Sequence, residues 1–120
     1  MKKILVVDDD EGILEAFELV LTEAGYEVEL STKDGEYIWG RIKDNRPDLI
    51  ILDVLLSGSD GRTICKRLKG DKTTKSIPII MVSAHPDAEK SVKDCGADDF
   101  IPKPFEMINL LKKVQVYLDK

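Results

Sequence analysis

The sequence predicts an α/β protein whose doubly wound sheet holds five parallel strands, in the order 2-1-3-4-5, with helices on both faces. Short apolar segments rich in Val, Ile and Leu alternate five times with longer segments of helical periodicity. The connections between these segments are short, which favours parallel strands joined by helical crossovers. Most of the apolar segments are unbroken, as is typical of strands that are covered on both faces.

The first strand and the first helix are predicted over residues 3–8 and 11–25. The segment KILVVD is short, apolar and β-branched, as expected of a fully buried strand. In EGILEAFELVLTEAG the helical period gathers apolar residues on one face, and Gly25 ends the helix. That face consists of Ile13, Leu14, Phe17, Val20 and Leu21. We expect the stripe of Ile13, Leu14 and Phe17 to belong to the core rather than to a docking surface.

The next two strands are predicted over residues 26–31 and 49–53, with a helix over 34–45 between them. YEVELS alternates like a half-buried strand, whereas LIILD is apolar up to its last residue. The helix is weakened by Gly40, and Pro47 breaks the chain before the third strand.

The remaining elements continue the alternation. Helices are predicted over residues 62–70, 86–96 and 104–118, and strands over 77–83 and 98–101. Proline suits the first turn of a helix, which is why the fourth helix is expected to begin at residue 86.

Length and composition indicate a single soluble domain, residues 1–120. The formal charge of −5 argues against nucleic-acid binding by this domain, because that function normally needs a basic face. No apolar run approaches the roughly 20 residues of a membrane span, and the run at residues 4–7 is too short for a signal peptide. Cys65 and Cys95 lack the spacing of a metal site and are expected to be free thiols. We therefore expect a cytoplasmic protein that does not bind membranes.

Acidic residues stand at the ends of two strands that the predicted order makes neighbours. The first strand ends in Asp8, Asp9 and Asp10, and Asp53 ends the third. Open α/β sheets bind ligands beyond the carboxyl ends of their strands, where the strand order reverses. Close carboxylates repel by about 1 kcal/mol per pair in water, and by about 4 at an effective dielectric of 20, so a hard cation such as Mg²⁺ would stabilise them. Alternatively, residues 8–10 form a solvated turn that caps the next helix.

Two further strand ends add a hydroxyl group and an amine. Ser83 ends the fourth strand, and Lys103 follows the fifth. Together with a metal and a carboxylate, these groups suit phosphoryl transfer, in which the carboxylate attacks and the positive charges and the hydroxyl stabilise phosphoryl oxygens. Taken singly, Ser83 is more typical of a helix cap and Lys103 of a surface charge, so the prediction depends on their conjunction.

Four segments, VVDDD, ILDVLLSGSDG, IPIIMVSA and GADDFIPKPF, resemble the receiver domain of bacterial two-component response regulators. The resemblance covers essentially the whole chain, and the spacing from Asp53 to Ser83 and Lys103 fits that family. It implies a flavodoxin-like fold and a signalling switch driven by phosphorylation. Such a domain is no turnover enzyme, since it catalyses only its own phosphorylation and the slow loss of the phosphoryl group.

The resemblance also implies a role for each site residue. Asp53 would accept the phosphoryl group from a sensor histidine kinase or a histidine phosphotransfer protein. Mg²⁺, or Mn²⁺ in its place, would be held by three carboxylates and one backbone carbonyl, those of Asp8, Asp9, Asp53 and Leu55. Ser83 would be the switch hydroxyl and Phe100 the switch aromatic. Lys103 would contact the phosphate, and the Lys103–Pro104 peptide bond is expected to be cis.

Three residues depart from the commonest pattern of that family. Ser57 stands where proline is usual, Leu55 is apolar, and His85 is the only histidine of the chain. In the family, the positions of Leu55 and His85 border the path of the hydrolytic water. We hypothesise that Leu55 hinders this water and lengthens the phosphorylated state, while His85 either orients the water or is simply an exposed loop residue.

By the same resemblance, the signal would be read on the surface of the fourth helix, the fifth strand and the fifth helix. The reader would be a downstream protein or an attached effector domain, and phosphorylation could also drive homodimerisation. The first helix and the site loops would face the kinase. The chain would be a complete regulator or the receiver part of a longer transcriptional regulator.

A second class of function is open at this point. ILVVDDDEG also resembles the Asp-x-Asp motif of haloacid-dehalogenase-type phosphatases, with Asp8 as nucleophile and Asp10 as acid/base. Here, however, Asp98 and Asp99 precede Lys103, the reverse of the order in that family, and the chain has no cap segment. A degenerate receiver kept only for docking is disfavoured by the full set of site residues.

Overall fold

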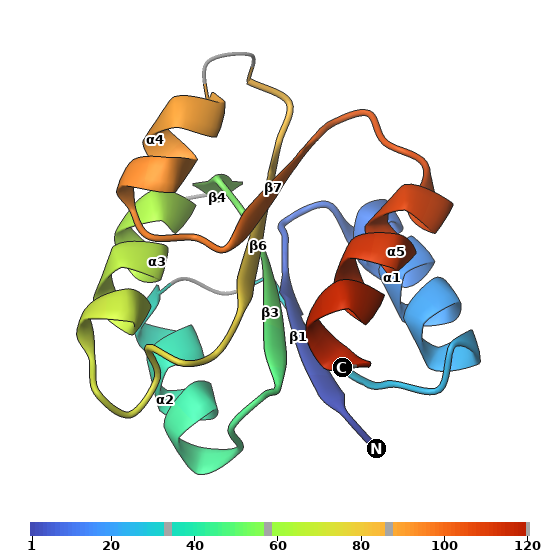
Figure 1. The fold of residues 1–120 in the computed structure, drawn as a ribbon, viewed down its shortest axis with the longest axis horizontal. Helices are drawn as coiled ribbons and strands as arrows, with labels where there is room; N and C mark the ends of the chain where they lie inside the picture. Colours follow the sequence, from blue (N-terminus) through green and yellow to red (C-terminus); the bar gives the residue numbers. More distant parts are fainter. Residues whose placement is uncertain (33–34, 57–58, 86–87, 120) are drawn as a thin grey trace.

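The computed structural model describes residues 1–32, 35–56, 59–85 and 88–119, without the side chains of residues 35–37, 55 and 59. Figure 1 shows a central sheet with helices on both of its faces. Along the described chain the elements are β1 (Lys3–Val7), α1 (Glu11–Glu23), β2 (Glu27–Ser31), α2 (Gly35–Asp44), β3 (Leu49–Asp53), β4 (Leu55–Leu56), β5 (Ser59–Asp60), α3 (Gly61–Gly70), β6 (Ile79–Ser83), α4 (Ala88–Asp94), β7 (Asp99–Pro102) and α5 (Met107–Leu118).

The main sheet confirms the predicted strand order. Its strands lie in the order β2-β1-β3-β6-β7, and neighbouring strands are parallel throughout. β6 and β7 are therefore the fourth and fifth strands of the prediction. The order reverses between β1 and β3, so the carboxyl ends of these two strands flank the crevice in which such sheets bind ligands.

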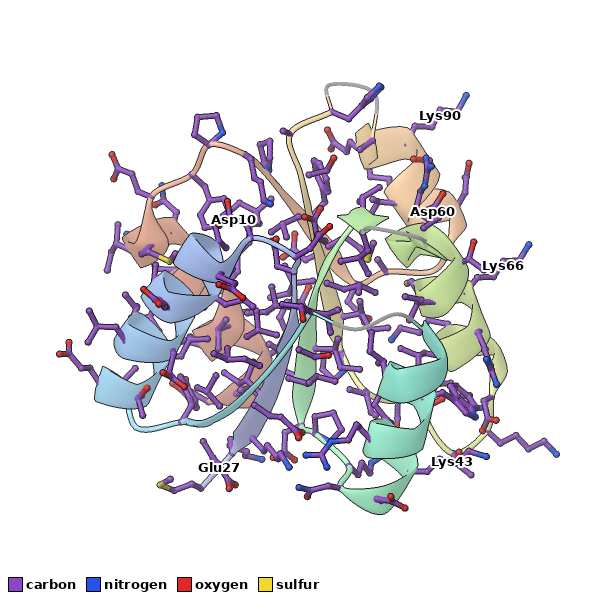
Figure 2. All side chains as sticks on the ribbon, turned by 180° about the vertical axis from the view of Figure 1, so that it is seen from behind. Asp10, Glu27, Lys43, Asp60, Lys66 and Lys90 are labelled. Carbon is purple, nitrogen blue, oxygen red and sulfur yellow. The ribbon has the colours of Figure 1, made fainter. Side chains whose placement is uncertain are left out.

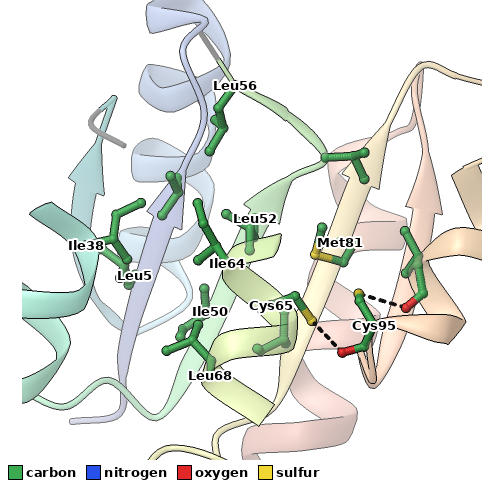
Figure 3. Close-up of a cluster of buried hydrophobic side chains, with 14 of the residues drawn as sticks. Leu5, Ile38, Ile50, Leu52, Leu56, Ile64, Cys65, Leu68, Met81 and Cys95 are labelled. Carbon is green, nitrogen blue, oxygen red and sulfur yellow. Dashed lines mark hydrogen bonds between the residues drawn. The ribbon is translucent and has the colours of Figure 1, made fainter. Parts of the chain in front are cut away.

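Alternating strand residues build two separate cores, one on each face of the sheet. The α2–α4 core includes Leu5, Val7, Ile50, Leu52, Ile64, Cys65, Leu68, Met81, Val92 and Cys95 (Figure 3). The α1–α5 core includes Ile4, Val6, Leu14, Phe17, Leu21, Ile51, Val82, Ile101, Leu110 and Val114. Figure 1 shows the corresponding helices, with α1 and α5 on one side of the sheet and α2, α3 and α4 on the other.

The stripe of Ile13, Leu14 and Phe17 predicted for the first helix belongs to the core. Leu14, Phe17 and Leu21 are buried in the α1–α5 core, and Ile13 packs half-buried against it. This prediction is therefore confirmed, and the helix contributes to stability chiefly through the apolar surface it buries.

The last two helices are shorter than predicted. Pro86, the predicted start of the fourth helix, lies outside the described residues, and α4, described from Ala88, ends at Asp94 rather than at residue 96. α5 begins only at Met107, because Glu106 has an extended backbone with φ −88° and ψ 139°. The segment before it belongs to the core packing, since the ring centroids of Phe105 and Phe17 lie 6.0 Å apart. Among the described helices, none is long and apolar enough to cross a membrane.

Both cysteines are free thiols, as predicted, and both are buried. The Cys65 Sγ donates to the Cys95 carbonyl oxygen at 3.6 Å, and the Cys95 Sγ donates to the Val92 carbonyl oxygen at 3.0 Å (Figure 3). Burial raises the pKa of the Cys65 thiol, which keeps it protonated and unreactive at neutral pH.

Candidate functional site

Strand alternation brings three predicted site residues to one face of the sheet. Asp8, Asp53 and Lys103 each come two residues after a strand residue of the α1–α5 core. Those strand residues are Val6, Ile51 and Ile101. Because side chains alternate with a period of two, the three charged side chains continue the α1–α5 side at the carboxyl ends of β1, β3 and β7.

Lys103 connects the two buried carboxylates. Its Nζ lies 3.0 Å from Oδ2 of Asp8 and 3.1 Å from Oδ2 of Asp53. The side chains of Asp8, Asp53 and Lys103 are 2%, 11% and 18% exposed, so solvent screens these charges only weakly. Burial alone would lower the pKa of Lys103, but its hydrogen bonds and attraction to Asp8 and Asp53 outweigh burial and raise the pKa. Lys103 therefore keeps a positive charge between the two carboxylates.

Asp8, Asp9 and Asp53 form a carboxylate cluster that suits a hard divalent cation. One oxygen from each of the three lies within 4.8 Å of the others. An all-oxygen donor set of a few carboxylates is what Mg²⁺ prefers, because it keeps further positions for water or phosphate oxygens. Lys103 brings one positive charge to the cluster, and a divalent cation would further offset the repulsion among its carboxylates.

Asp10 has a different task from its two neighbours. Its Oδ1 accepts hydrogen bonds from the amides of Gly12 at 2.9 Å and Ile13 at 3.2 Å, which caps the N-terminus of α1. Its own amide donates to Oδ1 of Asp8 at 2.9 Å and so orients that carboxylate. The capping turn considered for residues 8–10 therefore applies to Asp10. This engagement does not favour Asp10 as the acid/base of a phosphatase.

Ser83 lies at the end of β6, next to the strand end that carries Lys103. The residue is 1% exposed, and its Oγ accepts a hydrogen bond from the His85 amide at 3.0 Å. The carbonyl oxygen of Ser83 accepts one from the Lys103 amide at 2.8 Å, which fixes the two strand ends to each other. The Lys103–Pro104 peptide bond is cis. Asp53 in β3 is the register partner of Val82 in β6. Ser83 therefore lies one residue beyond the position opposite Asp53.

Phe100 lies on the α2–α4 side of the sheet, opposite the face that carries Lys103. Its half-buried ring packs against the α2–α4 core. Its register partner in β6 is Met81, which belongs to the same core and precedes Ser83 by two residues. Strand alternation thus directs Ser83 and Phe100 to the same face of the sheet, where a movement of one side chain can displace the other.

Arg62 connects the start of α3 with α4. Its guanidinium donates to Asp60 from Nε at 2.9 Å and from Nη2 at 2.6 Å, and to the Ser91 Oγ from Nη1 at 3.0 Å. Asp60 caps α3 through the Arg62 amide, and the side-chain bond from Arg62 lowers the pKa of the Asp60 carboxyl. The segment after Asp53 is thereby attached to the helix that follows Ser83.

Gly61 has a structural role at the site that the sequence prediction did not include. A Cβ added to Gly61 would lie 3.0 Å from the carbonyl carbon of Asp53, and closer still to its oxygen. The Gly61 amide also donates to the Val54 carbonyl oxygen at 2.7 Å, which holds it there. The pair Asp60-Gly61 signals a turn in the sequence. The position of this pair in the sequence does not indicate that the start of α3 packs directly against the backbone of Asp53.

The predicted tuning residues are only partly described. Leu55 begins β4, which pairs with β5 in a short antiparallel hairpin absent from the prediction. The Leu55 side chain and Ser57 lie outside the described residues, and His85 is exposed. The proposals for Leu55 as ligand and for Leu55 and His85 as tuning residues therefore stay predictions.

Comparison with known proteins identifies one family over nearly the whole chain. A family model described as the response regulator receiver domain matches residues 4–115. The response regulator MprA of Mycobacterium sp. (strain KMS) is 38% identical over 118 residues, which cover 97% of this chain and 50% of that protein. The chain thus spans about half the length of the curated relatives it matches.

Solved structures share both the fold and part of the sequence. The chemotaxis protein CheY4 of Vibrio cholerae has a TM-score of 0.88 and 33% identity, with 98% of this chain and 99% of that chain covered. The response regulator TrrA of Thermotoga maritima, solved in complex with Mg²⁺-BeF, has a TM-score of 0.87 and 31% identity. That comparison covers 98% of this chain and 100% of the other.

Proposed function

Because this chain belongs to the family of response regulator receiver domains, we propose that it is a signalling switch in which Asp53 accepts a phosphoryl group. One observation carries the proposal. Asp8, Asp9, Asp53 and Lys103 come from three strand ends and converge on one point at the crevice where the strand order reverses. A reactive carboxylate flanked by further carboxylates and one ammonium group suits the transfer of a doubly charged phosphoryl group.

The Asp53 carboxylate would act as the nucleophile. One of its oxygens attacks phosphorus and forms an O–P bond, while the bond from phosphorus to the donor breaks and its electron pair leaves with the donor. Lys103 would exchange its contact with the Asp53 oxygen for one with a phosphoryl oxygen. Mg²⁺ or Mn²⁺, held by Asp8, Asp9, Asp53 and the Leu55 carbonyl, would supply the charge that offsets the phosphoryl oxygens.

Ser83 and Phe100 would convert this chemistry into a signal. The Ser83 hydroxyl, now bonded to the His85 amide, would turn to donate to a phosphoryl oxygen. A hydrogen bond to a charged group is worth about 1.5–3 kcal/mol, enough to shift a two-state equilibrium about tenfold to a hundredfold. Since Phe100 shares the face of Ser83, we propose that the surface of α4, β7 and α5 changes in response.

The partners follow from this chemistry. We propose that a sensor histidine kinase or a histidine phosphotransfer protein donates the phosphoryl group, and that a downstream protein or an attached effector domain reads the changed surface. This chain covers about half the length of the curated relatives it matches, which is compatible with an attached effector domain. The domain would turn over no substrate beyond its own phosphoryl group, and a phosphorylated homodimer is one form that the output could take.

Phosphorylation by a small donor tests the proposed site directly. We expect acetyl phosphate with Mg²⁺ to add one phosphoryl group to the wild type, located by mass spectrometry at Asp53. Asp53→Asn should gain none, because an amide cannot form the acyl phosphate. Asp94→Asn, at an exposed residue of α4, is the matched control and should be labelled like the wild type. A phosphoryl group on Asp8, or undiminished labelling of Asp53→Asn, would contradict the proposal.

The lifetime of the phosphorylated state tests the hypothesis on Leu55. Leu55→Asn should speed the loss of phosphate by up to about tenfold, because an amide can hold the attacking water and one net hydrogen bond is worth roughly 0.5–1.5 kcal/mol. The rate is measured as phosphate release after removal of the donor. His85→Ala, measured alongside, should slow the release if His85 orients the water. An unchanged lifetime of Leu55→Asn rejects the role of Leu55.

A further inference from the structure

Arg62 joins two segments that begin at the candidate site and end in different helices. Its Nε and Nη2 donate to the Asp60 carboxylate at 2.9 Å and 2.6 Å, and its Nη1 donates to the Ser91 Oγ at 3.0 Å. Asp60 precedes α3, and Ser91 lies in α4. Figure 2 shows the labelled Asp60 where α3 begins, beside α4, which carries the labelled Lys90. None of these residues belongs to the set proposed above for phosphoryl transfer.

The Asp60 end of this bridge is held in place by the backbone. The Asp60 carboxylate also accepts a hydrogen bond from the Arg62 amide at 2.9 Å and so caps α3. Asp60 is the register partner of Leu55 in the short hairpin, and the next amide, that of Gly61, donates to the Val54 carbonyl oxygen at 2.7 Å. Two bonds to one carboxylate fix the plane of a guanidinium group, so the direction of the remaining donor, Nη1, is also set. The side chains of Asp60 and Arg62 are 40% and 37% exposed, so their ion pair contributes little to stability and acts chiefly by orienting Nη1.

The other end of the bridge, α4, is held to the domain by small side chains. Its buried residues are Ala88 and Val92, which bury less apolar surface than the isoleucine and leucine that α3 buries. The Ser91 hydroxyl is engaged as both acceptor and donor, because it accepts from Arg62 and donates to the Ala88 carbonyl oxygen at 3.0 Å. With so little apolar burial, the bond from Arg62 is a substantial part of what holds α4 in position beside α3.

We infer that the hydrogen bond between Arg62 and Ser91 is a latch that holds α4 in its resting position and opens when the domain is phosphorylated. The inference rests on the proposed function, in which the surface of α4, β7 and α5 changes. In the structure the bond accompanies the arrangement that precedes phosphoryl transfer, because Lys103 contacts Asp53 directly. A hydrogen bond is lost beyond about 3.5 Å, so a displacement of α4 by roughly 1 Å would open the latch. A contact made in one of two states favours that state by its own free energy, so the latch lowers the active fraction of the unphosphorylated domain.

Amide hydrogen exchange of the unphosphorylated domain tests the latch without any phosphoryl chemistry. Ser91→Ala removes the acceptor, and we expect the amides of α4 to exchange about threefold to tenfold faster, as suits the loss of one hydrogen bond. Alanine is the better helix former, so a weaker helix cannot explain faster exchange. Arg62→Lys should behave alike, because a lysine keeps the charge but cannot hold Asp60 by two bonds and reach Ser91 as well. Lys90→Ala, at an exposed residue of α4, is the control and should exchange like the wild type.

Binding of beryllofluoride with Mg²⁺, which stands in for the phosphoryl group, tests whether the latch opposes activation. In calorimetric titrations, Ser91→Ala should bind beryllofluoride about threefold to tenfold more tightly than the wild type, because the fraction of the domain that is already competent to bind rises by that factor. A mere packing defect in α4 would not tighten binding at the site. Arg62→Met and Ser91→Ala remove the same bond, so adding Ser91→Ala to Arg62→Met should change neither the affinity nor the exchange of α4 further.

Three results would overturn the inference. The first is unchanged exchange of α4 in Ser91→Ala, and the second is a further effect of Ser91→Ala in the Arg62→Met background. The third is weaker binding of beryllofluoride by Ser91→Ala, because the bond would then belong to the phosphorylated state. If acetyl phosphate labels Asp53 of the wild type and any of these results is found, the latch is wrong and the proposed function stands. If the wild type is not labelled at Asp53, the proposed function itself fails.

Discussion

Replacing Gly61 with alanine should destabilise the domain by about 3 kcal/mol or more, as expected of severe overpacking. The new Cβ would overlap the carbonyl group of Asp53 and would lie 3.1 Å from the Cα of Val54. These are backbone atoms of β3 and of the residue after it, so no side chain can turn aside to make room. The Gly61 amide is also bonded to the Val54 carbonyl oxygen at 2.7 Å, so α3 cannot withdraw without losing that bond. Urea denaturation would measure the effect as a lower midpoint.

Gly40→Ala is the matched control for this substitution. A Cβ at Gly40 would meet no atom within 4 Å, and the residue lies inside α2. Alanine there should stabilise the domain by about 0.5–1 kcal/mol, because glycine weakens a helix interior. If Gly61→Ala were as stable as the wild type, this would contradict the close contact between the start of α3 and the Asp53 backbone.

Gly61 also shows where prediction from sequence ends. The meeting of Asp8, Asp53 and Lys103 could be predicted, because parallel strands bring their carboxyl ends to one edge of the sheet and each residue follows a recognisable strand. The contact between Gly61 and Asp53 depends on how closely one helix approaches one carbonyl group. No spacing or composition encodes that distance.

The helix boundaries show a similar limit. Asp10 could be predicted as a helix N-cap, because an Asp directly before a segment of helical periodicity is a signal that depends only on nearby residues. The start of α5 could not, because Glu106 has an extended backbone and Phe105 before it packs against Phe17. The helical pattern alone favours a start at residue 104. Tertiary packing instead sets the start of α5 at Met107.

Replacing Lys103 with methionine should lower the free energy of unfolding by about 2–3 kcal/mol in metal-free buffer. Removing one partner of a fully buried ion pair costs about 3–5 kcal/mol, and the 18% exposure of the Lys103 side chain reduces that figure. The variant keeps the length of the side chain but removes the ammonium group that lies within about 3 Å of both Asp8 and Asp53. The two buried carboxylates would then lose the ammonium group that lies between them, next to the carboxylate of Asp9.

The response to Mg²⁺ separates this explanation from a simple packing defect. A cation that binds only the folded state stabilises it by mass action, by about 2.7 kcal/mol at a hundredfold excess over its dissociation constant. In Lys103→Met the ammonium group no longer competes for the oxygens of Asp8 and Asp53, so Mg²⁺ should raise the thermal midpoint more than in the wild type. Lys113→Met is the control, because its pair with Asp99 is more exposed and such pairs are worth about 0–1 kcal/mol. Equal Mg²⁺ responses in all three proteins would mean that Lys103 and the metal do not share the carboxylates, and the proposed site would lose its physical basis.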